Sequence, residues 1–539
     1  MTATGILVFS TLIGVIFSGI DNKLAELRKG RSFVLEREHT IIFGWSSEIF
    51  SVISELVAAN ESRTRACIAI LAQKDRVEME DEIRERVGKT KNTRVVCRTG
   101  DPIDIDDVEI VNPHDARSII VLPPPGDEAD SQVVKTILAL TNNPNRRKRP
   151  YHIVSRIHEP ENLSVARMVA DGEAELVPVD DLLARITAQT CRQSGLSVVY
   201  TDLLNFGGDE IYFAHEPRLA GKTFGEALTA YDKCSVIGLR TKGGRIELNP
   251  PMDTEISSGD VVILIAEDDS AITLREGADP EIEAGAIKVP QRREQGPERT
   301  LILGWNTRAP TIIAKLDGYV PLRSEVTVVS YDTTAMPPYS DELRHQRVTF
   351  RVGNTTDRRT LDELEVPPYD HVVVLSYSDE LDRQEADSRT LITLLHLREI
   401  ASQNSQSFSI VSEMLDDRNR QLAEITRADD FIVSDQLVSL LMAQISENKE
   451  LWAVFEQLFD PAGSELYLKP AGEYVDLGKP LSFYTVVEAA RRRDEVAVGY
   501  RIKSEAANPQ KSYGLYLNPD KSQRITFTQG DKMVLLAES

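Results

Sequence analysis

The sequence contains little cysteine and few aromatic residues. Only four of its 539 residues are cysteines, and aromatic residues make up 6%. The four thiols are scattered along the chain without a C-x-x-C pair: Cys67, Cys97, Cys191 and Cys234. Neither a disulfide framework nor a structural zinc site is therefore expected. Free thiols buried in a reducing cytoplasm are the plain interpretation.

Positive charge is also scarce. Lys and Arg number 62 against 85 Asp and Glu, which gives a formal net charge of -23. Because an acidic protein is repelled by phosphate backbones, nucleic acid is not expected as a partner. The mean hydropathy of -0.25 argues against many membrane spans. A hydrophobic content of 41% excludes wholesale disorder. At ~150 residues per domain, the length predicts three or four domains.

Recognisable catalytic motifs are missing. The eight histidines are dispersed, and neither H-E-x-x-H nor G-x-S-x-G occurs. No nucleophile and base can be paired from the sequence. We therefore predict that the chain is not an enzyme.

The first twenty residues carry no charged side chain. They are long enough for a helix that crosses a bilayer, which needs ~20 residues. A signal peptide would have a basic start and a small-residue cleavage site, and neither is present; a buried helix of a soluble domain stays an alternative. We expect a transmembrane helix over 1–22 and a basic juxtamembrane linker over 23–38. Four basic residues follow the span: Lys23, Arg28, Lys29 and Arg31. Because such residues stay on the cytoplasmic side, we expect the protein in the cell membrane with its C-terminal bulk in the cytoplasm.

An internal repeat organises the rest of the chain. Six segments of the first half reappear in the same order in the second half: 39–45 and 299–305, 98–101 and 351–354, 118–122 and 371–375, 154–162 and 411–419, 177–190 and 431–446, and 259–266 and 530–537. Six ordered matches are hard to attribute to chance. The sequence therefore predicts a tandem duplication.

Each copy begins with short apolar runs that alternate with amphipathic helices. In the first copy the runs are 40–43, 67–71, 94–97, 118–122 and 151–154. Nearly continuous apolar strands between helices are typical of a parallel, doubly wound α/β sheet. A helix and a smaller β-rich lobe follow in each copy.

These patterns place the domain boundaries. We expect, in order, a first Rossmann-like lobe, a crossover helix, a first small lobe, a linker, a second Rossmann-like lobe, crossover and interface helices, and a second small lobe. The corresponding ranges are 39–176, 177–195, 196–267, 268–298, 299–430, 431–460 and 461–539.

The order of these parts resembles a known architecture. A membrane helix, the basic juncture 27–32, the segment 38–46 and its echo at Gly304-Trp305 resemble paired RCK domains (regulators of K+ conductance). The resemblance is closer to the CASTOR/POLLUX family of ion channels. It implies one membrane helix followed by two tandem RCK-like units, and four chains that form a gating ring of eight lobes. It also implies regulation by Ca2+.

The sequence departs from this family pattern at its start. Such channels carry a pore helix and a selectivity filter before the last membrane helix, and no T-V-G-Y-G-like filter occurs here. Either the chain is truncated or the true start lies upstream. Conduction by this chain alone is not expected, whereas a gating role is.

The dinucleotide fingerprint G-x-G-x-x-G is incomplete in both copies. Gly44 and Gly304 keep the first glycine, but the second and third are lost, and NAD in its usual pose is not expected. We prefer the second cleft for an anion or nucleotide, because Arg308 stands there at the helix start where the first copy has Glu48. Alternatively, Glu48 is only a helix-start carboxylate and Arg308 a solvated side chain. The candidate ligand-binding residues are Gly44, Trp45, Ser46, Gly100, Asp101, Gly304, Trp305, Asn306, Arg308, Gly353 and Asn354.

An acidic segment offers a candidate cation site. Four carboxylates lie within seven residues: Asp101, Asp104, Asp106 and Asp107. Hard cations such as Ca2+ prefer several oxygen ligands. The segment lacks the glycine and the terminal glutamate of an EF-hand loop, and a solvated acidic helix start is the alternative.

Apolar stripes predict an interface. The helix 431–446 and the segment 451–459 carry more apolar side chains than a lone surface helix needs. A domain or subunit interface would bury them, and ordinary core is the alternative. The family resemblance implies a homotetramer.

We therefore expect a subunit of a ligand-gated cation channel, with potassium as the permeant ion and a small ligand or divalent cation as the signal. One alternative is a membrane-anchored, nucleotide-binding regulator of ion transport without its own pore. A Rossmann-type NAD-dependent oxidoreductase is the second alternative.

Overall fold

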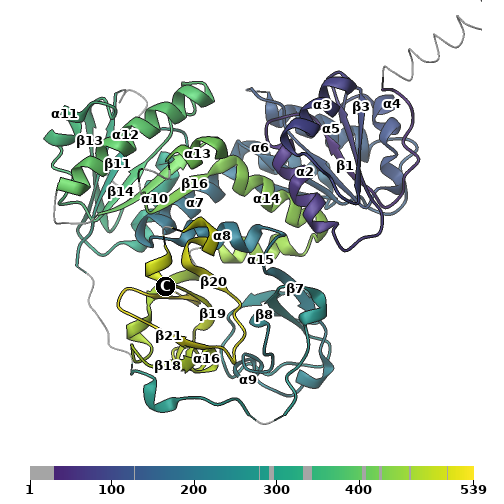
Figure 1. Ribbon diagram of the computed structural model, residues 1–539. Helices are drawn as coiled ribbons and strands as arrows, with labels where there is room; N and C mark the ends of the chain where they lie inside the picture. The colour runs from purple at the N-terminus through teal and green to yellow at the C-terminus, as the bar shows by residue number, and fades with distance from the viewer. Residues whose placement is uncertain are drawn as a thin grey trace, which may run out of the picture. The chain divides into compact units, whose positions relative to one another are not determined.

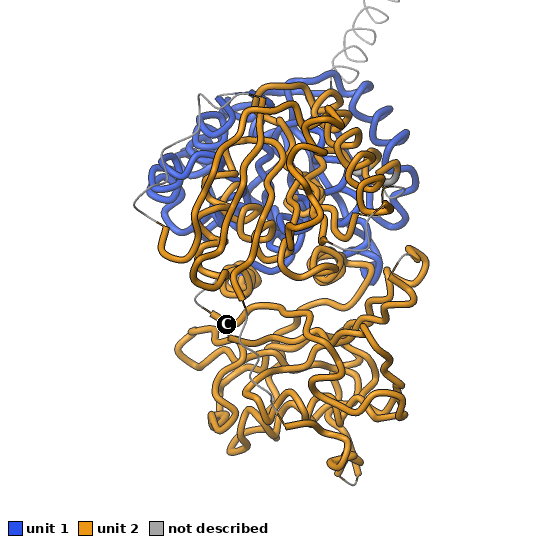
Figure 2. Tube along the Cα trace, turned by 90° about the vertical axis from the view of Figure 1, so that its left-hand side faces the viewer, with its two compact units in different colours: residues 1–179, 439–449 blue, residues 180–438, 450–539 orange. Residues whose placement is uncertain are grey.

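A computed structural model describes residues 30–538 except 127, 278, 290–295, 332–342, 404–407, 424, 425, 427, 461, 462 and 507. The chain divides into two compact units (Figure 2). The first comprises residues 1–179 and 439–449, and the second comprises 180–438 and 450–539. The expected span at 1–22 lies outside the described residues. Within the described part, no helix is both long and apolar enough to cross a membrane.

The first unit is built on a six-stranded parallel sheet of order β3-β2-β1-β4-β5-β6 (Figure 1). Its strands are β1 Thr40–Phe43, β2 Ala66–Ala72, β3 Thr93–Thr99, β4 Ser118–Val121, β5 Ile153–Ile157 and β6 Ala174–Pro178. The connecting helices are α2 Ile49–Ala59, α3 Arg76–Arg86, α4 Ile105–Val108, α5 Ala129–Thr141 and α6 Pro160–Ala170. Helices on both faces bury the central strands, and Ile41, Ile42 and Phe43 have no exposed surface.

The second unit contains a sheet of the same order, β13-β12-β11-β14-β15-β16. Its strands are β11 Arg299–Leu303, β12 Ser324–Ser330, β13 Gln346–Val352, β14 His371–Val374, β15 Ser409–Met414 and β16 Asp430–Val433. Its helices are α10 Ala309–Tyr319, α11 Arg358–Glu363, α12 Arg383–Gln403 and α13 Asp417–Ala423. Both sheets have the strand order of a Rossmann fold. The prediction of two doubly wound parallel sheets is therefore confirmed.

Two pairs of helices follow the sheets. They are α7 Val179–Arg192 with α8 Leu196–Leu204, and α14 Ser434–Glu447 with α15 Leu451–Leu458. Residues 180–192 of α7 belong to the second unit, whereas residues 439–447 of α14 belong to the first. The first unit thus includes helical residues from the second copy of the repeat, and the second unit includes helical residues from the first copy. The apolar residues Leu440, Leu441 and Ile445 of α14 are buried.

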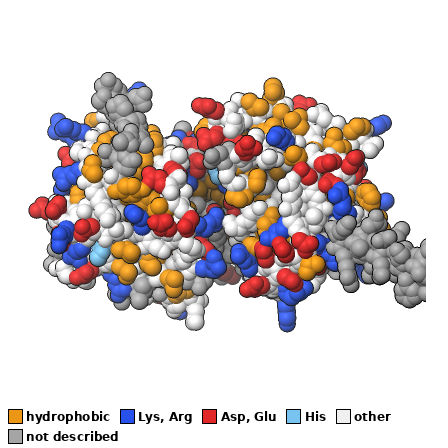
Figure 3. Space-filling model, turned by 90° about the horizontal axis from the view of Figure 1, so that it is seen from above, with side chains coloured by type: hydrophobic (Ala, Val, Ile, Leu, Met, Phe, Trp, Pro, Cys, Tyr) orange, Lys and Arg blue, Asp and Glu red, His pale blue; other side chains and the backbone are white. Residues whose placement is uncertain are grey.

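The second unit also contains both small antiparallel lobes. The first has strand order β7-β10-β8-β9 and the second β17-β22-β19-β20, so the two sheets correspond strand by strand. The first lobe comprises β7 Glu210–Ala214, α9 Phe224–Ala227, β8 Ser235–Arg240, β9 Ile246–Leu248 and β10 Val261–Ala266. The second comprises β17 Ser464–Pro470, β18 Pro480–Ser482, α16 Phe483–Arg491, β19 Val496–Arg501, β20 Leu515–Leu517, β21 Arg524–Thr526 and β22 Lys532–Glu538. On the surface shown in Figure 3, acidic and basic side chains are interspersed.

Candidate functional site

A glycine turn follows the first strand of each parallel sheet, where a dinucleotide fold holds phosphate. Gly44 and Gly304 have φ angles of 91° and 100°. A Cβ at Gly44 would lie 2.3 Å from the carbonyl oxygen of Leu122, and a Cβ at Gly304 would lie 2.4 Å from that of Leu375. Only glycine combines this backbone conformation with such a close approach. The close packing of neighbouring strands is therefore sufficient to explain both glycines.

In the first unit, a buried ion pair closes the end of this turn. Glu48 stands at the start of α2, and its Oε1 lies 2.7 Å from Nη2 of Arg156 on β5. The side chain of Glu48 is 3% exposed and that of Arg156 is 13% exposed. A carboxylate thus stands where a phosphate would accept hydrogen bonds from the helix.

In the second unit, the same place holds a cation whose charge is already balanced. Arg308 at the start of α10 pairs with Glu413 on β15, and its Nη1 lies 3.2 Å from Oδ1 of Asp180. Burial alone would lower the pKa of Arg308, but the two carboxylates raise it above its ordinary value. The alternative of a solvated Arg308 is wrong, because its side chain is only 11% exposed.

The two ion pairs are the same feature with opposite polarity. Glu48 and Arg308 each lie four residues after the turn glycine, and Arg156 and Glu413 each follow a Val-Ser pair on the equivalent strand. An anion at the second turn would have to compete with Glu413 and Asp180 for Arg308. The structure therefore adds no support for the preference for the second cleft, and its ligand stays a prediction.

Three of the other residues predicted at these turns have packing or hydrogen-bonding partners, whereas the buried hydroxyl of Ser46 has no hydrogen-bond partner among the described residues. The ring of Trp45 meets Phe50 edge-on at 5.7 Å between centroids, and Trp305 meets Phe350 at 5.9 Å. The buried Asn306 amide donates to the carbonyl oxygen of Ser376 at 2.9 Å.

The glycines predicted from the repeated segments 98–101 and 351–354 lie two strands from the first turns. Strands β2 and β12 separate β3 from β1 and β13 from β11. A Cβ at Gly100 would lie 2.9 Å from Cδ1 of Leu71, and a Cβ at Gly353 would lie 2.7 Å from Cγ2 of Thr360. Asp101 and Asn354 each accept a hydrogen bond from a backbone N–H two residues on, at 3.1 and 3.2 Å. These contacts account for the residues through turn geometry and close packing.

The acidic segment after β3 uses most of its carboxylates locally. Asp104 caps α4 by accepting a hydrogen bond from the backbone N–H of Asp106 at 2.9 Å. Asp107 accepts from the backbone N–H of Asp101 at 2.9 Å and pairs with Arg31. Within the described residues, no group of three or more His, Cys, Asp or Glu side chains is arranged to hold a metal ion. Calcium at this segment stays a prediction without support from the geometry.

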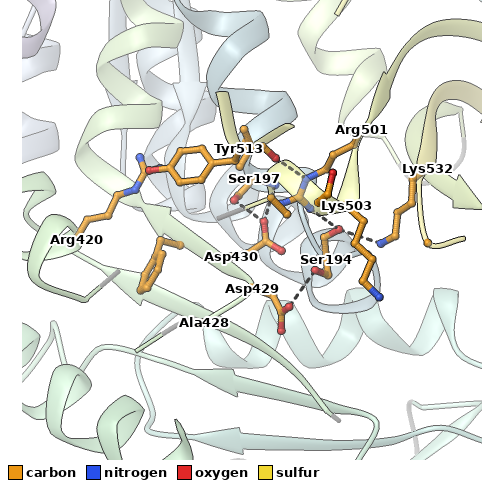
Figure 4. A pocket seen from close by; sticks show the side chains of 15 residues that line it. Ser194, Ser197, Arg420, Ala428, Asp429, Asp430, Arg501, Lys503, Tyr513 and Lys532 are labelled. Atoms are coloured by element: carbon orange, nitrogen blue, oxygen red, sulfur yellow. Dashed lines mark hydrogen bonds between the residues drawn. The ribbon is translucent and has the colours of Figure 1, made fainter. Parts of the chain in front are cut away.

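The second unit contains a cavity of about 720 Å³ that the sequence did not indicate (Figure 4). Its walls come from the start of α8, the start of β16, the end of β19 and the start of β22. Six charged residues line it: Arg420, Asp429, Asp430, Arg501, Lys503 and Lys532. Positive side chains thus outnumber negative ones there, although the whole protein is strongly acidic.

Both carboxylates of the cavity are occupied by hydrogen bonds. Asp430 accepts from the backbone N–H groups of Gly195 at 2.6 Å and Ser197 at 3.1 Å, and also from the Ser197 hydroxyl. Burial outweighs these bonds and raises the pKa of Asp430 to about 7. Asp429 accepts from the backbone N–H of Ile410 at 2.8 Å.

Two of the cations converge on one carbonyl oxygen. Arg501 Nη1 donates to the carbonyl oxygen of Ser194 at 3.2 Å, and Lys532 Nζ donates to the same oxygen at 3.0 Å. Arg501 Nε also donates to the carbonyl oxygen of Tyr513 at 3.2 Å. Across the described part of the chain, neither Arg501 nor Lys532 forms an ion pair with a carboxylate.

A comparison of the two repeats could have revealed these cations. Arg501 and Lys532 are directly opposite on β19 and β22, and the equivalent pair in the first small lobe is Arg240 and Val261. The repeat alignment at Gly259-Asp260 and Gly530-Asp531 therefore places a lysine where the first copy has a valine. Composition and strand pattern alone carry no such signal.

Comparison with solved structures defines the class of fold. The human SLO3 gating ring matches with a TM-score of 0.62 and 14% sequence identity, over 93% of this chain and 99% of that chain. The chain thus has the fold of a gating ring.

Sequence comparison then gives the family. Residues 180–282 match the family model described as Castor and Pollux, part of voltage-gated ion channel. The chain is 30% identical to the probable ion channel POLLUX of Arabidopsis thaliana, over 100% of this chain and 69% of that protein. It is also 30% identical to the probable ion channel CASTOR of Oryza sativa subsp. japonica, over 99% of this chain and 63% of that protein. The chain belongs to the CASTOR/POLLUX family of ion channels. It spans about two thirds of the length of the curated relatives it matches.

Proposed function

We propose that this chain is a subunit of a ligand-gated cation channel in the cell membrane, with potassium as the permeant ion. Its cytoplasmic part would form a gating ring that couples ligand binding to a pore-lining helix at 1–22. The observation that carries the proposal is the duplicated architecture, which matches a channel gating ring along nearly its whole length. Relatives named as ion channels support it, and they favour a non-enzyme over an NAD-dependent oxidoreductase.

We propose the following domain organisation along the chain. Residues 39–176 and 299–430 are the two RCK-like Rossmann lobes, and residues 196–267 and 461–539 are the two small lobes. Residues 177–195 and 431–460 are crossover helices, and residues 23–38 and 268–298 are linkers. Four chains would place eight lobes beneath one pore.

Gating requires that the ring has two arrangements with different ligand affinity. A ligand can shift the equilibrium between them only by the ratio of its two affinities, so that a hundredfold preference corresponds to about 2.7 kcal/mol. The exchange of helical residues between the units makes α7 and α14 the natural elements to transmit such a shift.

The proposal is tested by assembly and ion flux together. The protein, expressed from its complete gene and purified from membranes, should have the mass of four copies of the encoded subunit by native mass spectrometry. In reconstituted vesicles it should carry potassium but not choline. A monomer, or vesicles no more permeable than protein-free ones, would contradict the proposal. A tetramer without flux would favour the regulator that has no pore of its own.

A further inference from the structure

The second small lobe holds two like charges directly opposite each other. Arg501 on β19 and Lys532 on β22 are register partners in adjacent antiparallel strands. Like charges in this position repel and destabilise a sheet. The residue surface of Arg501 is 9% exposed, so solvent screens this repulsion poorly. A sheet that retains such a pair suggests a use for the charge other than folding.

The first small lobe shows that the fold does not need the second charge. Its equivalent strands β8 and β10 pair Arg240 with Val261. The same sheet topology therefore forms with an arginine opposite a valine. Lys532 is thus a feature of the second copy alone, and it lines the cavity.

The positive charge at the cavity is not neutralised by an ion pair. Burial lowers the pKa of both Arg501 and Lys532, and the charge of Arg501 lowers the pKa of Lys532 further, although the nearby charges of Asp429 and Asp430 partly oppose both shifts. Lys503 adds a third cation to the lining, and among the described residues its ammonium group has no hydrogen-bond or ion-pair partner. Figure 4 shows Arg501 and Lys532 extending toward Ser194.

We propose that this cavity binds a small phosphate-bearing anion, with the phosphate held between Arg501, Lys532 and Lys503. Guanidinium and ammonium groups are the side chains that recognise phosphate. A volume of about 720 Å³ lies within the range of small-molecule sites. Phe431 lines the same cavity and offers a ring surface to a planar group, as a nucleotide would carry. The ring of Tyr513 also lines the cavity, with the guanidinium carbon of Arg420 5.8 Å from its centroid.

The test is a calorimetric titration of the intact purified chain with ATP, in low salt and with EDTA to remove divalent cations. We expect saturable binding at one site per chain. Adenosine, which has no phosphate, should not bind. Inorganic phosphate is titrated separately. If phosphate binds as tightly as ATP, the site recognises the phosphate group alone. If ATP binds more tightly, the nucleoside contributes as well. Either result supports the proposal.

The variant Lys532→Val restores the valine of the first small lobe and should weaken ATP binding at least tenfold. Its melting temperature without ligand should equal or exceed that of the wild type, because a repulsive pair is removed. The matched control Lys242→Val removes a lysine at the position in the first lobe that corresponds to Lys503, and it should leave ATP binding unchanged. Equal ATP affinity in Lys532→Val and wild type, adenosine binding as tightly as ATP, or no binding of ATP or phosphate would each overturn the proposal. Binding is measured without ion flux, so this proposal and the channel proposal fail separately.

Discussion

At the scale of single residues, the two turn sites are closed by buried ion pairs of opposite polarity. Glu48 pairs with Arg156 in one lobe, and Arg308 pairs with Glu413 in the other. A buried pair costs desolvation free energy, and its Coulomb attraction only offsets that cost when both partners are present. The repeat thus retained the pair while exchanging its signs. This pattern is expected of a structural lock, in which complementarity matters and polarity does not.

If the ion pair is structural, exchanging the charges of Glu48 and Arg156 should restore the stability that is lost when one charge is removed. Glu48→Gln leaves Arg156 buried without its carboxylate and should lower the free energy of unfolding by about 3 kcal/mol. The double exchange Glu48→Arg with Arg156→Glu reproduces the polarity of the second lobe and should recover most of that loss. Urea denaturation measures both. Glu161→Gln, at an exposed helix position, is the control and should change little. A double exchange less stable than the single variant would contradict the account.

The raised pKa of the buried Asp430 carboxyl predicts that the free energy of unfolding depends on pH. Burial raises its pKa from the ordinary 3.8 to about 7. Between these values the folded chain holds a proton that the unfolded chain has lost, so this group makes stability fall as pH rises, by about 1.4 kcal/mol per pH unit. Asp430→Asn should remove this slope. The difference in unfolding free energy between wild type and variant, followed from about pH 5 to 6.5, is the measurement. A pH-independent difference would show that Asp430 does not titrate in this window.

At the scale of elements, α7 is joined to the start of β11 by one charged cluster. Glu298 lies 2.8 Å from Nη2 of Arg192 at the end of α7 and 3.4 Å from Nε2 of His371. Burial alone would raise the pKa of Glu298, but the bonds to His371 and Arg192 together lower it to about 2. The contact fixes the crossover helix to the second parallel sheet.

We expect Glu298 to stabilise the folded chain near neutral pH and to lose this effect in acid. Because the folded pKa of Glu298 lies below its ordinary 4.5, its contribution is fully present above pH 4.5 and is lost as pH falls toward 2. Glu298→Gln should cost about 3 kcal/mol of unfolding free energy at about pH 6, and the cost should shrink by about pH 3.5. Glu325→Gln, on an exposed carboxylate of the next strand, is the control. Guanidinium denaturation at the two pH values measures the effect, and a cost that grows on acidification would contradict it.

The elements differ in how far the sequence could predict them. The central parallel strands were predictable because both of their faces are buried, which leaves continuous apolar runs such as 118–122. The partner of α14 was not predictable, because an apolar stripe shows that a helix is buried but not which copy of the repeat buries it. The charged cavity was missed for a similar reason: Arg501 and Lys532 are far apart in sequence and meet only through strand pairing. The ion pair at Arg308 was missed because Arg308 lies at the start of α10 and its partner Glu413 lies on β15, 105 residues further along the chain.

At the scale of the whole molecule, duplication explains why one chain carries two unequal copies of the same sites. The turn sites exchanged the signs of their ion pair, and one small lobe gained a cation that the other lacks. Diverged copies allow one copy to keep a structural role while the other acquires a ligand site.

The net charge of -23 adds a second expectation, since the proposed acidic assembly below a pore would concentrate cations near its mouth. Conductance per open channel should therefore fall when salt is raised with an impermeant cation at constant potassium, and a constant value would argue against it.

The most direct test of the account is a current recording from membranes that contain the product of the complete gene. With ATP applied to the cytoplasmic face, we predict potassium-selective currents whose open probability changes in the wild type and in Lys242→Val but not in Lys532→Val. An open probability that ATP leaves unchanged in all three proteins would contradict the role of the cavity in gating. The absence of any current above that of control membranes would contradict the assignment of this chain to a conducting channel.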